Sequence, residues 1–191
     1  MSFAKAIKSP SQLMILTAIF SALLFSSTLY SAESELTLSL FQTIDERLGY
    51  MEDVALFKAQ NRNPIEDFER EKIVLSDAKE LAASHGLDPN SMERFFIAQI
   101  NAAKAIQYRY SAELLTREIP TRSIDLQADI RPALDRLGSD IVTLFATLLQ
   151  SRNSLGEEDR EGLMKTLRSR LLTDAEREAL FDAMLEVRRS H

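Results

Sequence analysis

Apolar residues recur every three or four positions along most of this chain, a spacing that places them on one face of an α-helix. The first such run predicts a helix over 35–62, whose inner face carries Leu40, Ile44, Leu48, Met51 and Ala55. No run alternates with a period of two over a convincing length, so the sequence predicts no strand.

Two cap-and-proline signals divide the next part of the chain. The segment 63–66 offers an asparagine for the N-cap, a proline for the first helical position and a glutamate two residues later. It predicts a second helix that starts at Asn63, runs to about Ser84 and is ended by Gly86. Asp88 and Pro89 repeat the signal and predict a third helix that runs to about Leu115.

The last third of the chain has weaker signals. Residues 116–128, around Pro120, lack periodicity and are predicted to form a loop. A fourth helix is predicted over 130–152, with Pro132 in its first turn, where proline is tolerated.

Capping-box spacing predicts two more helices, one at Ser154 with Glu157 and one at Thr173 with Glu176. The sequence therefore predicts an all-α fold: a single-domain helical bundle of about six helices.

The N-terminal segment has the organisation of a secretory signal peptide. Two lysines precede an apolar stretch over 13–25, and 26–32 is mostly small and polar. The stretch is shorter than the roughly 20 residues of a membrane span. We expect residues 1–32 to be removed, leaving a domain over 33–191 that is periplasmic or secreted. An uncleaved anchor is the alternative, because Leu29 and Tyr30 interrupt the small-residue pattern at the cleavage site.

Composition excludes several classes of function. Loss of residues 1–32 would move the net charge from −6 to −8, so the chain is a poor partner for nucleic acid. The absence of cysteine rules out thiol chemistry and thiolate metal sites. The only two histidines are His85, at a predicted helix end, and His191, so a zinc site has little support. We expect no metal, no cofactor and no stable membrane association after cleavage.

Three cations occupy positions that should face the inside of the bundle. Arg47 and Lys58 are eleven residues apart, about three helical turns, so they project at nearly the same angle. Arg70 lies on the inner face of the next predicted helix. Buried cations are costly unless they are neutralised, and no row of acids on the same stripe does so. The pattern indicates a pocket for a ligand that bears carboxylates.

Four segments of this chain resemble the AroQ class of chorismate mutases, in particular its secreted gamma subclass. They are 47–58 (RLGYMEDVALFK), 64–71 (PIEDFERE), 95–107 (FFIAQINAAKAIQ) and a later segment with Asp125-Leu126 and Ile130-Arg131-Pro132. The resemblance implies an all-helical enzyme that rearranges chorismate to prephenate in one concerted pericyclic step, without a covalent intermediate, metal or organic cofactor. Members are often dimers, so it leaves a homodimer open.

The resemblance also assigns roles residue by residue. Arg47 and Arg131 would bind the two substrate carboxylates, with Arg70 as a further active-site arginine. Lys58 and Gln107 would donate hydrogen bonds to the ether oxygen. Asp67 and Glu71 match positions that contact the ring hydroxyl, and Ala103 stands where other members carry a small hydroxyl residue.

Each of these residues also has an ordinary structural interpretation. Taken alone, Arg47 and Lys58 could be surface residues with acidic partners, and Asp67 in a first helical turn gains from the helix dipole. The alternative for the whole chain is an exported helical binding or adaptor module without catalytic activity. The two hypotheses differ in one respect: an enzyme brings these side chains into one pocket, whereas an adaptor scatters them.

Overall fold

The computed structural model describes residues 34–116, 118–123, 125–152 and 154–190. The predicted signal peptide, 1–32, lies outside the described residues. Among the helices described, none is both long and apolar enough to cross a membrane.

The first predicted helix is divided near its middle. Residues 34–49 are helical, Tyr50 forms a turn, and α2 covers Met51–Gln60. Tyr50 keeps helical dihedral angles (φ −70°, ψ −12°), and its carbonyl still accepts from the Val54 amide at 3.0 Å. The chain therefore continues in nearly the same direction, and the buried face predicted for 35–62 is preserved across the break.

The predicted start of the second helix at Asn63 is wrong. Helix α3 covers Phe68–Ser84, and its N-cap is Asp67, whose side chain accepts from the backbone amide of Arg70. Arg62 has a positive φ of 55°, and the Lys58 ammonium donates to the Ile65 carbonyl, so residues 63–67 form a loop over the end of α2. Gly86, with φ 72°, follows the last turn of α3, as predicted.

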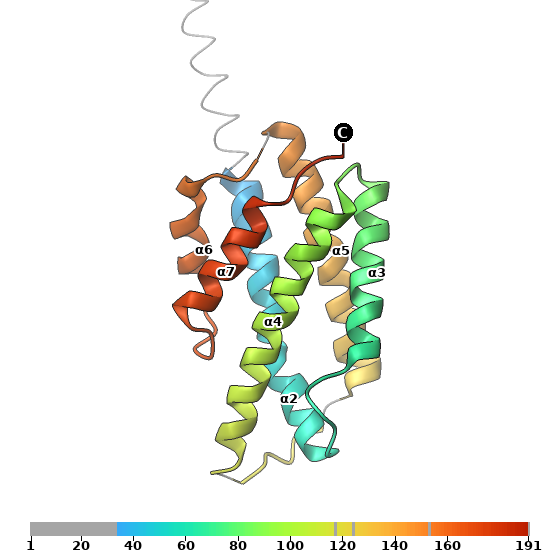
Figure 1. The fold of residues 1–191 in the computed structure, drawn as a ribbon. Coiled ribbons are helices and arrows are strands. Elements are labelled where there is room, and N and C mark those ends of the chain that lie inside the picture. The colour runs from blue at the N-terminus through green and yellow to red at the C-terminus, as the bar shows by residue number, and fades with distance from the viewer. Residues whose placement is uncertain (1–33, 117, 124, 153, 191) are drawn as a thin grey trace, which may run out of the picture. The chain divides into compact units, whose positions relative to one another are not determined.

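Helix α4, Pro89–Leu114, confirms the third predicted helix. The Asp88 side chain accepts from the backbone amides of Asn90 and Ser91 and caps it. Phe95 and Phe96 on its inner face are almost completely buried. Figure 1 shows α4 along the middle of the bundle, in contact with α2, α3 and α7.

After the loop, a π-helical turn, Leu126–Ile130, leads into α5, Arg131–Ser151. Pro132 lies in the first turn of α5, as predicted. The turn was not predicted, and it makes Arg131 the first residue of α5.

The predicted capping box at Ser154 is wrong, whereas the one at Thr173 is confirmed. A short 3-10 turn, Glu157–Asp159, precedes α6, Arg160–Thr166. Asp159 takes the capping role because its carboxylate accepts from the Gly156 amide at 2.9 Å. Helix α7, Asp174–Leu185, has the reciprocal Thr173 and Glu176 contacts.

The prediction of an all-α bundle is confirmed. The described residues contain no strand, only an isolated bridge between Leu87 and Arg189. The core consists of aliphatic and phenylalanine side chains from all the long helices. One pocket is lined by residues from five parts of this bundle: the first helix, α2, α3, α4 and the start of α5.

Candidate active site

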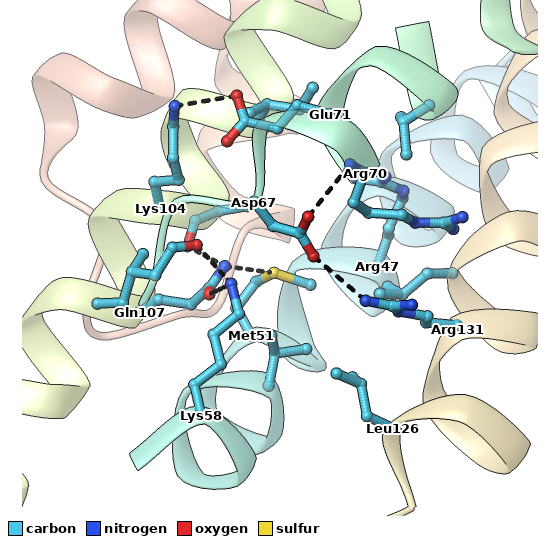
Figure 2. A pocket seen from close by; sticks show the side chains of 16 residues that line it. Arg47, Met51, Lys58, Asp67, Arg70, Glu71, Lys104, Gln107, Leu126 and Arg131 are labelled. Atoms are coloured by element: carbon cyan, nitrogen blue, oxygen red, sulfur yellow. Dashed lines mark hydrogen bonds and ion pairs between the residues drawn. The ribbon is translucent and has the colours of Figure 1, made fainter. Parts of the chain in front are cut away.

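The pocket has about 690 Å³ of empty space, its open mouth included. The structure brings all eight site residues proposed from the sequence to its walls. These are Arg47, Lys58, Asp67, Arg70, Glu71, Ala103, Gln107 and Arg131. They come from five segments of the chain, and Figure 2 labels all of them except Ala103, with their side chains gathered around the pocket.

Arg47 is the most deeply buried cation of the pocket, with 6 % of its surface exposed. Its Nη1 donates to the Gln99 Oε1 at 2.8 Å, and its guanidinium lies 5.7 Å from the centre of the Phe96 ring. Among the described residues it has no ion pair, and its Nε has no hydrogen-bond partner. Burial lowers the pKa of Arg47 to about 10, although Asp135 opposes the shift. It is therefore a cation at neutral pH that forms no ion pair with a carboxylate of the described residues.

Lys58 and Gln107 are joined at one side of the pocket. The Lys58 ammonium donates to the Gln107 Oε1 at 3.1 Å and to the backbone carbonyl of Ile65. Burial lowers the pKa of Lys58, while the nearby carboxylates, Asp67 first among them, oppose the shift. The Gln107 Nε2 donates to the Ala103 carbonyl at 3.3 Å and lies 3.5 Å from the Met51 sulfur. Thioether sulfur is a weak acceptor, so a ligand oxygen can replace it.

Asp67 and Arg131 join α3 to α5. The Arg131 Nη2 donates to the Asp67 Oδ2 at 3.2 Å, while Oδ1 accepts from the Arg70 backbone amide at 3.2 Å. The Arg70 guanidinium forms an ion pair with Asp135, which lies on α5. Each of the two arginines, Arg70 and Arg131, thus uses one guanidinium nitrogen to bond to a carboxylate of the chain. The other N–H groups of each guanidinium are left for a ligand.

Lys104 and Asp135 belong to this site although no role was assigned to them from the sequence. The Lys104 ammonium donates to the Glu71 Oε2 at 3.2 Å and lies in the pocket wall. Its spacing from Ile100 and Gln107, four and three residues away, places it on the same face of α4 and could have revealed it. Asp135 lies four residues after Arg131, but its contact with Arg70 depends on how α3 and α5 pack.

The walls of the pocket carry an excess of positive charge. Five cations and two carboxylates line it, a balance of +3 in a chain whose net charge is −6. Ala103 contributes a small apolar surface to the pocket wall. The arrangement is suited to a small dianion, and no cluster of metal-ligating residues occurs in the described part of the chain.

Comparison with known proteins identifies the family. The family described as "Chorismate mutase type II" matches residues 34–108. The secreted chorismate mutase of Yersinia pestis is 39% identical over 145 residues, which cover 76% of this chain and 78% of that protein. The monofunctional chorismate mutase of Enterobacter agglomerans is 33% identical over 177 residues, which cover 90% of this chain and 96% of that protein.

Solved structures agree with the sequence comparison. The crystal structure of the Yersinia pestis secreted chorismate mutase superposes with a TM-score of 0.73 at 36% identity, over 79% of this chain and 97% of that chain. A chorismate mutase from Burkholderia thailandensis gives a TM-score of 0.64 at 29% identity, over 78% and 96% of the two chains. The chain belongs to the type II chorismate mutase family, which confirms the family resemblance found in the sequence.

Proposed function

We propose that this protein rearranges chorismate to prephenate in one concerted pericyclic step, with no metal or organic cofactor. The observation that carries the proposal is Arg47, a buried cation that has no carboxylate partner among the described residues. A substrate carboxylate would supply that partner. The pocket's balance of +3 suits a substrate with two carboxylates.

Arg47 and Arg131 are the proposed anchors for the two carboxylates. They approach the pocket from different elements, the first helix and the start of α5. Guanidinium groups pair with carboxylates through two parallel N–H bonds. Holding both ends of a flexible substrate in the compact reactive shape lowers the barrier by orientation. Arg70, fixed by Asp135, would add a third donor.

Lys58 and Gln107 are the proposed donors to the ether oxygen, where negative charge develops as the C–O bond breaks. Each is already fixed by other contacts, so neither has to be ordered when the substrate reacts. Donors that are fixed before the reaction stabilise the transition state more than the ground state.

The two acidic residues of the pocket receive different roles. Both carboxylate oxygens of Asp67 are engaged, one with Arg131 and one with the cap of α3. Glu71 keeps one oxygen for a ligand, because Lys104 bonds only to its Oε2. We therefore assign the contact with the ring hydroxyl to Glu71, and the orientation of Arg131 to Asp67.

The adaptor hypothesis required these side chains to be scattered over the surface. Instead, all eight line one pocket, and the chain belongs to a family of enzymes. Nothing in the described residues favours a non-catalytic role.

A spectroscopic assay of chorismate consumption by residues 33–191 tests the proposal. Wild-type protein should turn over chorismate, and Lys58→Ala should lose roughly 10²–10³-fold in kcat, as when one oxyanion donor is removed. Lys72→Ala is the matched control, since Lys72 is an exposed α3 lysine whose one ion-pair partner among the described residues is Glu69. An inactive wild type would refute the proposed function, and a fully active Lys58→Ala would refute the assignment of the donor.

Export is proposed on the N-terminal pattern and on relatives named secreted chorismate mutase from Yersinia pestis and Mycobacterium tuberculosis. The mature protein should begin near residue 32 or 33 and lie in the periplasm or outside the cell. Its intact mass should lack residues 1–31, and a mass that includes them would contradict the proposal.

A homodimer rests on the family resemblance alone, and sedimentation velocity should give twice the mass of the mature chain.

A further inference from the structure

Lys104 lies in the pocket wall and has no role in the chemistry proposed above. Its ammonium joins α4 to α3 through the 3.2 Å bond to the Glu71 Oε2. Both side chains are about three-quarters buried, with 24% and 23% of their surfaces exposed. Figure 2 shows the pair at the opposite side of Asp67 from Arg131. A partly buried ion pair inside a binding pocket affects whatever that pocket binds.

The bond fixes a side chain that would otherwise be free to rotate. Glu71 has three rotatable bonds, and in the described residues its only side-chain partner is Lys104. Because Lys104 takes Oε2, the remaining oxygen, Oε1, is presented with a defined orientation. A partner that holds the carboxylate before the ligand arrives removes the entropy cost of ordering it on binding.

We infer that Lys104 is a positioning residue, which holds Glu71 so that its Oε1 accepts a hydrogen bond from the substrate ring hydroxyl. The inference rests on the proposed function and extends it to a residue outside the eight assigned above. Lys104 acts through Glu71 and does not touch the reacting atoms.

The bond could instead serve only to hold α3 against α4, and the chain offers a matched control for that role. Lys79 on α3 donates to the Glu93 carboxylate on α4 at 2.8 Å, with 38% and 32% of the two side chains exposed. This second ion pair joins the same two helices but lies outside the pocket walls. Lys79→Met removes an inter-helix bond of the same kind without changing the site.

The test compares chorismate with an analogue in which hydrogen replaces the ring hydroxyl. Lys104→Met should raise KM for chorismate about 10-fold, the loss expected for one hydrogen bond to a charged group, with kcat nearly unchanged. With the analogue as substrate, Lys104→Met should have the same KM and kcat as wild type. Lys104→Arg should recover most of the loss, and Lys79→Met should match wild type on both compounds.

Two outcomes would overturn the inference. An equal loss on both compounds would mean that Lys104 acts on the fold or binds a substrate carboxylate directly. An added loss from Lys104→Met in a Glu71→Gln background would mean that it does not act through Glu71. Wild-type protein that consumes neither compound would refute the proposed function, and the inference with it, so the two failures are distinguishable.

Discussion

Methionine at position 47 would occupy a volume close to that of the arginine while removing its charge. Arg47 is buried, makes one side-chain hydrogen bond, to Gln99, and has no ion pair in the described part of the chain. We expect its charge to lower the stability of the free protein, because replacement of buried charges by apolar residues of similar size is often neutral or stabilising.

The size of this cost follows from the pKa of Arg47, which burial lowers from the ordinary arginine value to about 10. A shift of this size corresponds to about 3 kcal/mol. The native state gives up this proton at lower pH than the unfolded state. The cost is therefore present at every pH below about 10, and it disappears as the pH rises from there toward the ordinary pKa of an arginine in the unfolded chain.

In the single variant Arg47→Met, a second effect opposes the gain in the free energy of unfolding. Arg47→Met leaves the Gln99 amide buried with neither end paired, since its Nε2 already has no partner among the described residues. An orphaned amide costs about 1–3 kcal/mol, so Arg47→Met alone should be nearly neutral. With Gln99→Leu added, the free energy of unfolding should rise by about 1–3 kcal/mol, and Tm by roughly 2–4 °C per kcal/mol.

Urea unfolding of residues 33–191 at pH 7 without substrate, followed by far-UV circular dichroism, measures the effect. The double variant should be more stable than wild type and inactive on chorismate. Arg109→Met is the control, because Arg109 forms two bonds with the Glu176 carboxylate, and its loss should lower stability. A double variant less stable than wild type by more than about 1 kcal/mol would refute the reasoning.

Three further predictions concern the active site. Arg131→Ala should weaken binding and turnover together in steady-state kinetics, because the substrate loses both a carboxylate partner and its held shape; an unchanged KM would contradict this. Activity should be flat from about pH 5 to 8. It should then fall on the alkaline side at a pH below 10.5, because burial lowers the pKa of Lys58 and the donor must stay protonated; a plateau beyond pH 10.5 would exclude Lys58. Gln107→Glu should be active at pH 5 and lose activity as the new carboxyl ionises, since only its protonated form donates; equal activity at pH 5 and 8 would show that position 107 does not face the breaking bond.

Much of the fold could be predicted because the local signals agreed with the tertiary packing. Asp88 with Pro89 started α4, and Gly86 ended α3, since both act through their own backbone neighbours. The helix start predicted at Asn63 was wrong because Asn63 and Asp67, two possible N-caps, lie within five residues of each other. Asp67 prevails because the Lys58 bond to the Ile65 carbonyl holds the intervening residues out of a helix.

For the site as well, the features set by local sequence could be predicted, whereas those set by the packing of helices could not. Helical spacing was enough to place Arg47 and Lys58 on one face, and both line the pocket. The partners were not predictable in this way. Which acid meets Arg70 depends on the packing of α3 against α5, and the π-helical turn that sets the position of Arg131 has no clear pattern in the sequence.

The central claim is that this pocket converts chorismate to prephenate using its own side chains. Nuclear magnetic resonance of chorismate incubated with purified residues 33–191 and a metal chelator tests it directly, because it identifies the product as well as the loss of substrate. The account predicts that prephenate appears in step with chorismate consumed, at a rate proportional to protein, and that Lys58→Ala slows it. Unchanged chorismate, or a product other than prephenate, would contradict the account.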